Sequence, residues 1–376
     1  MSDILKCTTT LSQFKKPIIS ITGSCGKTTT CKMIQEMLQH SYIVNKTHEN
    51  SNSMLGIPWC VNTYFKNDAD IWLIELGISK PNDMDILMEM VTPTIRIMTN
   101  VCNAHVSNFS SLKEYQTEKL KFLDYIQEND VAIINNDDPV LSTYMNDNVF
   151  PPSVKIINCG SKDTDDVQFI KHSINSNCMS STVTIRINRD KSLITFNLDG
   201  INEHNAFNCC LAVGCAIHFN IPIDTIKKTL NKFKLYKHRG LIVTNPKFTI
   251  YDHTYNGVNH AFMKNIESFK CVHSKNKLII LGISETSTHV INMDHVIQII
   301  EHSLKVTNKI IIYTTPECST LLSMIQQMYF KNIFCANSFD IVIEKIRLLS
   351  SLEKLDIYIQ GDHYLKLFDL VNKLIA

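Results

Sequence analysis

The 376-residue sequence lacks the long apolar runs and the charge imbalance that mark several classes of protein. No apolar stretch approaches the roughly 20 residues of a membrane-spanning helix, and segment 1–16 has no apolar core like that of a signal peptide. The formal net charge is only +1, so no surplus of basic residues favours binding to nucleic acid or to a membrane. We therefore expect a cytoplasmic protein with small-molecule partners, and the sequence leaves its oligomeric state open.

The sequence also lacks the cysteine spacing that metal sites and redox motifs use. It has 13 cysteines but no C-x-x-C, and Cys209 and Cys210 form the only adjacent pair. The cysteines could be buried thiols of the protein core or ligands of a metal site. Because they are spread widely along the sequence, buried thiols are the favoured interpretation. No internal repeat or low-complexity tract is evident.

Length and composition are those of an ordinary globular protein with more than one domain. Hydrophobic residues make up 44% of the chain and charged residues 19%. The length exceeds the size at which a single core usually stops growing. We expect two domains, with three as the alternative.

The most informative stretch is Ile18-Ile19-Ser20-Ile21-Thr22-Gly23-Ser24-Cys25-Gly26-Lys27-Thr28-Thr29-Thr30, in which a β-like run enters a glycine loop that opens into a helical pattern. Glycines at 23 and 26 allow the backbone to fold around a polyphosphate, and the following helix directs its positive end to the same place. Lys27 supplies a charge for the terminal phosphates, and a hydroxyl at Thr28 or Thr29 can bind Mg²⁺. The general P-loop pattern has another glycine at position 21, where this chain has isoleucine, and a glycine turn with an incidental lysine is the alternative.

Beyond this loop, β-branched apolar runs alternate with segments long enough to be helices, which predicts a mostly parallel sheet covered on both faces. The runs are 71–75, 95–99 and 131–135. Runs 183–187 and 193–198 flank a polar turn and predict an antiparallel hairpin at the edge of the sheet. Helical patterns follow at 203–219 and 224–233.

A second βα series begins after Lys237-His238-Arg239-Gly240, with strands expected at 248–251, 278–281, 309–313 and 356–359. We therefore place the domain boundary near Arg239, with domains 1–239 and 240–376. The predicted fold class is α/β: a P-loop domain with a mostly parallel sheet and an antiparallel edge hairpin, followed by a smaller Rossmann-like domain.

Two further residues lie where strands of this sheet end. Glu75 ends the strand 71–75, and His105 lies just beyond the strand 95–99. Ligands of open α/β sheets bind at the carboxyl edge, so these side chains and the P-loop are expected to meet there. A carboxylate and an imidazole beside a triphosphate suit Mg²⁺ binding or orientation of the phosphates, although each alone could simply be solvated.

These motifs together resemble the Mur ligases, a family of ATP-dependent amide ligases, and among them the branch that adds D-alanyl-D-alanine. The similarity covers about residues 17–265 well and the rest more faintly. Besides the P-loop, the matching segments are Asn50-Ser51-Asn52-Ser53-Met54-Leu55-Gly56-Ile57-Pro58, Thr99-Asn100 with Ala104-His105, Phe109, Ser111 and Lys119, Asn135-Asn136-Asp137-Asp138-Pro139, His204-Asn205 with Asn208, Arg239, and Asp252-His253-Thr254-Tyr255-Asn256.

The resemblance implies roles for residues of this chain. Residues Gly23, Ser24, Cys25, Gly26, Lys27, Thr28, Thr29, Asn135, Asn208, Arg239 and Asp252 would contact ATP. Thr28 or Thr29 with Glu75 would bind one Mg²⁺ and His105 a second, while Lys119 would be the lysine that the family carbamylates into a further metal ligand. Lys27, Glu75, His105 and Lys119 would form the catalytic set. Substrate would contact Asn50, Asn52, Tyr255 and Asn256. On physical grounds alone, Lys119 would be a surface lysine of a helix.

The implied reaction is amide bond formation between a carboxylate and an amine through an acyl phosphate, with release of ADP and phosphate. Complete peptidoglycan ligases begin with a UDP-binding domain, whereas about sixteen residues precede the P-loop strand here, so we expect a substrate that is not held through UDP. Departures at Ser53, Gly257-Val258-Asn259 and near residues 281–286 and 360–362 leave the amine open. The alternatives are cyclisation of an activated carboxylate, a nucleotide-binding regulator without turnover, and another P-loop enzyme.

Overall fold

The computed structural model describes residues 2–48, 50–102, 108–255, 259–283, 293–315, 319–329, 333–350 and 353–375. The chain folds into two compact units. Unit 1 consists of Met1–Ser173, Thr182–Leu198 and Glu203–Phe233, and unit 2 of Ile174–Ser181, Asp199–Asn202 and Lys234–Ala376. The domain boundary near residue 239 stays a prediction.

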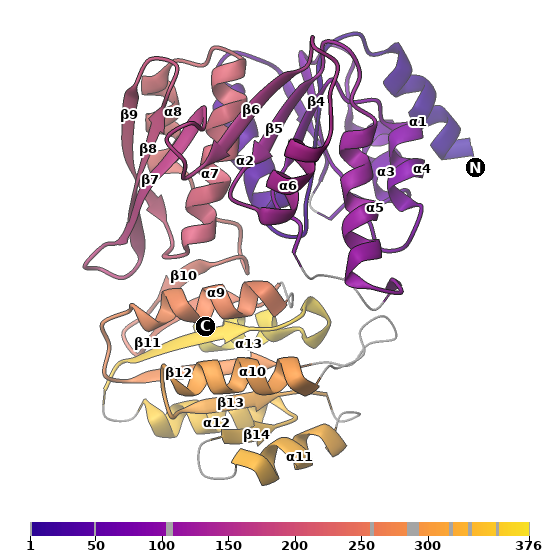
Figure 1. The fold of residues 1–376 in the computed structure, drawn as a ribbon. Helices are drawn as coiled ribbons and strands as arrows, with labels where there is room; N and C mark the ends of the chain where they lie inside the picture. The colour runs from indigo at the N-terminus through magenta and orange to yellow at the C-terminus, as the bar shows by residue number, and fades with distance from the viewer. Residues whose placement is uncertain are drawn as a thin grey trace. The chain divides into compact units, whose positions relative to one another are not determined.

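Unit 1 is built on a large, mostly parallel sheet (Figure 1). In the described part of the chain its strand order is β2-β3-β1-β4-β5-β6-β7-β8-β9. The strands are β1 (Ile18–Thr22), β2 (Val44–Lys46), β3 (Ile71–Glu75), β4 (Ile95–Met98), β5 (Val131–Asn135), β6 (Lys155–Gly160), β7 (Val167–Ile174), β8 (Ser180–Ile187) and β9 (Ser192–Asp199). Every residue of β1 and β3 is buried, as expected for central strands covered on both faces.

Helices pack against both faces of this sheet. On one face α2 (Lys27–Leu38) contacts α7 (Glu203–His218) and α8 (Ile223–Lys232). The helices that connect the parallel strands farther along are α3 (Gly56–Tyr64), α4 (Asp83–Met90), α5 (Leu112–Asp124) and α6 (Pro139–Asp147). The N-terminal helix α1 (Ser2–Gln13) packs against α3 and α4. This arrangement leaves the loops at the carboxyl ends of the strands available to form a site.

The last two strands of the sheet confirm the predicted edge hairpin. Thr182 pairs with Asn197 and Thr184 with Thr195 through side-chain hydrogen bonds of 3.1 Å. Because one residue number rises as its partner's falls, β8 and β9 run antiparallel. Side chains of β8 alternate between half-buried and buried positions, which is the pattern of a strand with one covered face.

Unit 2 contains a second sheet of order β10-β11-β15-β12-β13-β14 in the residues described. Its strands are β10 (Leu241–Thr244), β11 (Phe248–His253), β12 (Lys277–Gly282), β13 (Ile310–Tyr313), β14 (Ile333–Ala336) and β15 (Leu355–Gln360). Among the described strand pairs of this sheet, β10 and β11 run antiparallel and the others run parallel. The helices are α9 (Asn259–Lys270), α10 (Met293–Leu304), α11 (Ser319–Tyr329), α12 (Phe339–Leu349) and α13 (Leu367–Ile375), with the 3₁₀ turn η3 (His363–Leu365).

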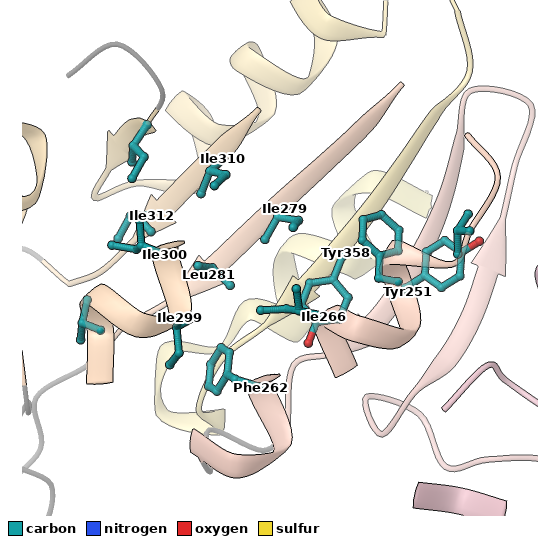
Figure 2. Close-up of a cluster of buried hydrophobic side chains, with 14 of the residues drawn as sticks. Tyr251, Phe262, Ile266, Ile279, Leu281, Ile299, Ile300, Ile310, Ile312 and Tyr358 are labelled. Atoms are coloured by element: carbon teal, nitrogen blue, oxygen red, sulfur yellow. The ribbon is translucent and has the colours of Figure 1, made fainter. Parts of the chain in front are cut away.

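Two hydrophobic clusters fill the space on the two faces of this second sheet. Figure 2 shows the first, in which Phe262 and Ile266 of α9 and Ile299 and Ile300 of α10 lie against side chains of the strands such as Ile279. The second cluster joins the opposite strand side chains to α12 and α13. Unit 2 therefore has a three-layer core of its own.

The predicted α/β class and sheet type are confirmed, and the strands expected at 71–75, 131–135, 248–251, 278–281 and 356–359 lie within strands of the structure. The short strands β2, β10 and β14 and the strands β6 and β7 were not individually predicted. Among the described residues, no helix combines the length and apolarity needed to cross a bilayer.

Candidate functional site

Strand register brings four segments of unit 1 to one edge of the sheet. Ile21 of β1 lies beside Glu75 of β3, and Thr22 lies beside Met98 of β4. Met98 in turn pairs with Ile134 of β5. Because all these strands are parallel, the P-loop, Glu75, the segment after β4 and Asn135 share the carboxyl edge, as the sequence predicted.

The P-loop needs both of its glycines. Gly23 has φ +145° and Gly26 has φ +86°, in the region that residues with a Cβ rarely adopt. An added Cβ on Gly23 would lie 1.9 Å from Thr99 Oγ1, and one on Gly26 would lie 2.4 Å from Asn208 Oδ1. The loop is thus packed closely between the end of β4 and helix α7.

Hydrogen bonds join the P-loop to the residues that follow β4. Ser24 N donates to Asn100 O at 2.9 Å, and Cys25 N donates to Asn100 Oδ1 at 2.9 Å. Cys25 O accepts from Thr99 Oγ1 at 2.6 Å and from Asn100 Nδ2 at 3.0 Å. These bonds fix the course of the loop before any ligand binds.

Helix α2 begins directly after the loop and supplies the cationic side of the site. Gly26 is its N-cap, and the hydroxyl residues Thr28 and Thr29 of its first turn are buried. Lys27 Nζ donates to Gly23 O at 2.8 Å, so the ammonium group folds back over the loop. The N-terminus of a helix together with a lysine favours the binding of an anion at this point.

Glu75 presents a buried carboxylate next to the P-loop strand. Its side chain is 5% exposed, and Oε1 accepts a hydrogen bond from Asn52 Nδ2 at 2.9 Å. The backbone is fixed by Glu75 N donating to Thr47 Oγ1 and by Leu76 N donating to Ile21 O. The carboxylate is therefore held in one orientation by neighbouring elements.

Lys119 lies on the buried side of α5 rather than at the surface. A serine N-cap starts this helix, because Ser111 Oγ accepts from Glu114 N. Its buried residues follow helical spacing and are Tyr115, Glu118, Lys119, Phe122 and Leu123. The physical expectation of a surface lysine was wrong, because the side chain is buried, and the role that the resemblance implies for Lys119 stays a prediction.

The ammonium group of Lys119 lies close to that of Lys27. Lys119 Nζ donates to Gly23 O at 3.4 Å, the same oxygen that accepts from Lys27. Burial, and after it the charge of Lys27, holds the pKa of Lys119 well below its usual value. A buried lysine of this kind favours the neutral amine, which is a nucleophile.

The two asparagines that the resemblance assigns to the nucleotide border the same site. Asn135 Nδ2 donates to Thr99 O at 2.7 Å, which links β5 to the segment after β4. Asn208 of α7 lies against Gly26, and its Nδ2 donates to Asn205 Oδ1 at 3.4 Å. Their contact with adenine stays a prediction.

The candidates Arg239, Asp252 and Tyr255 belong to unit 2, and Asp252 among them is buried. Its Oδ2 is paired with His238 Nδ1 at 2.8 Å, and its Oδ1 accepts from Thr254 Oγ1 at 2.7 Å. The guanidinium carbon of Arg239 lies 4.1 Å from the ring centroid of Tyr255. Their roles towards nucleotide and substrate stay predictions, and His105 and Asn256 lie outside the described residues.

The donor atoms at the edge of the sheet fit Mg²⁺ in part. Within the described ranges, no group of three or more His, Cys, Asp or Glu side chains could hold a metal. Magnesium at a nucleotide site needs only one or two protein oxygens, because phosphate and water supply the others. A buried carboxylate at Glu75 and a hydroxyl at Thr28 or Thr29 match that requirement in kind.

Several residues that position the site were given no role of their own from the sequence, although Asn100 and Asp138 belong to the matching segments. Asn100 binds two residues of the P-loop, and Ser24 Oγ contacts Tyr115 Oη at 2.8 Å. Asp138 accepts from Val101 N and also caps α6. Asn100 and Asp138 each follow a strand at the carboxyl edge, which is the signal that could have identified them.

Comparison with known families adds independent information. The model of the Mur ligase middle domain matches residues 21–216, which is more than half of the chain. Among curated proteins, UDP-N-acetylmuramoyl-tripeptide--D-alanyl-D-alanine ligase of Bacillus subtilis is 26% identical over 274 residues, covering 72% of this chain and 57% of that protein. The enzyme of the same name from Borreliella burgdorferi is 28% identical over 274 residues, with 72% and 56% covered.

Solved structures show the same fold over the whole chain. MurF from Acinetobacter baumannii superposes with a TM-score of 0.86 at 17% identity, covering 100% of this chain and 80% of that one. MurF ligase from Thermotoga maritima in complex with ADP gives 0.84 at 19% identity, with 100% and 82% covered. Folylpolyglutamate synthase from Mycobacterium tuberculosis, complexed with ADP and AMPPCP, gives 0.77 at 12% identity, with 100% and 95% covered.

Proposed function

The chain belongs to the Mur ligase family, and from that premise we propose that it is an ATP-dependent ligase that joins a carboxylate to an amine. The chain spans little more than half the length of the curated relatives it matches, so their activity and substrates enter here as a proposal. The observation that carries the proposal is the meeting of Lys27 and Lys119 at one oxygen of the P-loop, Gly23 O.

ATP would bind with its phosphates in the P-loop. The amide groups at the start of α2 and the ammonium of Lys27 supply positive charge there, and Asn208 and Asn135 border the loop. Positioning and charge stabilisation are what phosphoryl transfer chiefly requires of a protein. Hydrogen bonds to Asn100 set the course of the P-loop, and because they are not covalent the loop can still adjust around the phosphates.

Glu75, with Thr28 or Thr29, would hold one Mg²⁺, and the family resemblance assigns a second to His105. A bound Mg²⁺ neutralises negative charge on the phosphate oxygens. For this chemistry, Asn52 would orient the carboxylate of Glu75 through its hydrogen bond to Oε1.

Lys119 would act as a carbamate. Its neutral amine adds to carbon dioxide, forming an N–C bond and releasing one proton, and the product is an anion on the side chain. The carbamate places an anion beside the ammonium group of Lys27, in a buried place where two ammonium groups would repel each other. The carbamate oxygens could then bind a metal as a carboxylate does.

In the proposed reaction, the substrate carboxylate attacks the γ-phosphorus of ATP and ADP leaves. The amine then attacks the carbonyl carbon of the acyl phosphate, an amide bond forms, and phosphate leaves with the proton balance met by loss of one amine proton. Lys27 offsets the charge that develops in the first step. Exclusion of water would protect the acyl phosphate from hydrolysis.

The experiment is a phosphate-release assay with purified protein, ATP and Mg²⁺. The first substrates are UDP-N-acetylmuramoyl-tripeptide and D-alanyl-D-alanine, as named for the relatives, followed by pools of other carboxylates and amines. We expect release only when both a carboxylate and an amine are present. Lys27→Ala should abolish it, whereas Lys32→Ala, which removes another lysine of α2, should retain it.

Other outcomes would identify a different function. Release with a carboxylate alone, together with a product lighter by one water, would indicate cyclisation. Tight nucleotide binding without release in any pool would indicate a regulator. ADP formation with no acceptor requirement would contradict the ligase proposal.

A further inference from the structure

Two cysteine side chains meet beside the P-loop. Cys25 belongs to the loop itself, Cys102 follows β4, and their Sγ atoms are 4.0 Å apart. Both side chains are half-buried rather than enclosed in the core. We propose that Cys25 and Cys102 form an oxidative modification site, at which a peroxide converts the two thiols into an intramolecular disulfide.

The backbone holds the two residues together without help from the sulfur atoms. Cys102 N donates to Ser24 Oγ at 3.0 Å, and Ser24 Oγ also contacts Cys102 O at 3.0 Å. Cys25 is anchored through Asn100, which accepts from Cys25 N and donates to Cys25 O. To bond, the sulfurs must approach by roughly 2 Å, a change that rotation about two Cα–Cβ bonds can supply.

Most of the other described cysteines lack access. Eight of the twelve are buried, among them Cys209, whose sulfur contacts the thioether of Met33 at 3.7 Å. Cys271 is exposed, and its thiol donates to Glu267 O. Cysteine reactivity requires access, and the pair at the P-loop combines access with a neighbouring thiol at 4.0 Å.

The chemistry balances with one peroxide. The Cys25 sulfur is oxidised to a sulfenic acid with release of one water, and the Cys102 sulfur then displaces the hydroxyl group as a second water. Two thiols and hydrogen peroxide thus give one disulfide and two waters. The hydrogen bond with Cys25 and burial raise the pKa of the Cys102 thiol, which disfavours its ionisation and hence its attack on peroxide as the first step.

The disulfide would fix a residue of the P-loop that precedes Gly26 and Lys27. A loop that cannot adjust around phosphate should bind nucleotide more weakly, by at least about tenfold in Kd. This consequence rests on the proposed function, whereas the crosslink itself does not. Reduction with dithiothreitol should restore binding, because the disulfide is reversible.

The test uses the full chain, treated with hydrogen peroxide and then alkylated. Intact mass and a non-reducing peptide map are measured for wild type, Cys102→Ser and Cys271→Ser. Before alkylation, we expect disulfide formation to make wild type and Cys271→Ser about 2 Da lighter, and after alkylation both should yield a linked peptide with Cys25 and Cys102. Cys102→Ser should give no such peptide, and its Cys25 should be trapped by dimedone as a sulfenic acid.

The result is separable from the ligase proposal because the mass readout needs neither nucleotide nor turnover. A crosslink that forms while the Kd for ADP stays unchanged would retain the modification site and overturn its effect on nucleotide binding. A linked peptide with other cysteines, crosslinks only between two chains, or oxidation of Cys25 in wild type without any link to Cys102 would overturn the proposal.

Discussion

Asn52 donates a hydrogen bond from Nδ2 to Oε1 of Glu75 over 2.9 Å. Gly77 N donates to the carbonyl of Asn52 at 2.7 Å, and a Cβ on Gly77 would lie 2.6 Å from Asn52 Oδ1. The loop that contains Asn52 is thus fixed against the end of β3. The resemblance implied a substrate contact for Asn52, and the structure shows in addition that it orients the carboxylate of Glu75.

Replacing Asn52 by alanine should weaken the use of Mg²⁺. Without the amide, the buried carboxylate loses a fixed orientation and one hydrogen bond, and such partners of a metal ligand typically contribute about tenfold or more to metal affinity. We expect the Mg²⁺ concentration for half-maximal phosphate release to rise roughly tenfold, with a smaller change in KM for the acyl substrate.

Asn45→Ala is the matched control for this change. Asn45 also donates from Nδ2, in its case to the backbone oxygen of Lys66, but away from Glu75. Its Mg²⁺ dependence should equal that of wild type. If Asn52→Ala raised only the KM of the acyl substrate, a direct substrate contact would explain Asn52 and its role towards Glu75 would be refuted.

Lys119 should make the stability of the protein depend on pH. Its pKa in the folded state is held well below the usual 10.5 of a lysine, so between the folded and the usual pKa the unfolded chain binds more protons than the folded one. Stability then rises with pH through this window, by at most about 1.4 kcal/mol per pH unit. In Lys119→Met this contribution is absent, so the free energy of unfolding of the variant should depend less steeply on pH.

Urea unfolding in buffer free of carbon dioxide, at several values from pH 7 to 10, measures this difference. Exclusion of carbon dioxide matters because carbamylation would change the charge of the wild-type lysine. Lys113→Met, at an exposed position of the same helix, should keep the wild-type slope. Parallel profiles for wild type and Lys119→Met would show that the buried lysine is not desolvated in the folded protein.

Much of the fold could be predicted from the sequence because its strands are central and apolar. Runs such as Ile71–Glu75 and Leu355–Gln360 are buried on both faces, and their composition alone indicates a strand. Strands β2 and β14 were missed, since three or four residues at the edge of a sheet have no clear periodicity. Pairing with a neighbour, which the sequence does not display, determines such strands.

The candidate site was predictable where chemistry depends on strand ends, and less so where it depends on packing between elements. Glu75 and the P-loop lie at strand ends, which sequence shows directly. The burial of Lys119 was not predicted, because its helix has charged residues on both sides of the position. The contact of Cys25 with Cys102 links positions 77 residues apart, and no local pattern predicts it.

Gly26 and Asn208 should be coupled in stability. Gly26→Ala places a Cβ 2.4 Å from Asn208 Oδ1 at a φ of +86°, which costs about 1–2 kcal/mol for the conformation and more for the overlap. In an Asn208→Ala background the overlap disappears, so the cost should fall by about 1 kcal/mol or more. Free energies of unfolding of the four proteins measure this coupling.

Gly200 provides the control for the cycle. It has a similar φ of +85°, but the nearest atom to its added Cβ is Leu235 Cδ1, at the end of a flexible side chain. Gly200→Ala and Asn208→Ala should therefore be additive within experimental error. Additivity of Gly26→Ala with Asn208→Ala would mean that the asparagine moves aside freely, contrary to the close packing described for the P-loop.

His253 should lower the stability of unit 2 in acid. It is buried, its Nδ1 lies 3.2 Å from Asn265 Nδ2, and burial lowers its pKa from 6.5 to about 4. Between these values the unfolded chain binds the proton and the folded chain does not, so stability falls as pH drops from 6.5 towards 4, by up to about 3 kcal/mol.

His253→Asn tests this expectation, because the amide oxygen can still accept from Asn265 but does not titrate. The difference in unfolding free energy between wild type and variant should shrink or change sign from pH 7 to pH 4, in favour of the variant. The exposed His273, replaced in the same way, should leave the wild-type profile intact. A constant difference in unfolding free energy between wild type and His253→Asn across this range would contradict the prediction. It would mean that the buried His253 takes up a proton as easily in the folded protein as in the unfolded chain.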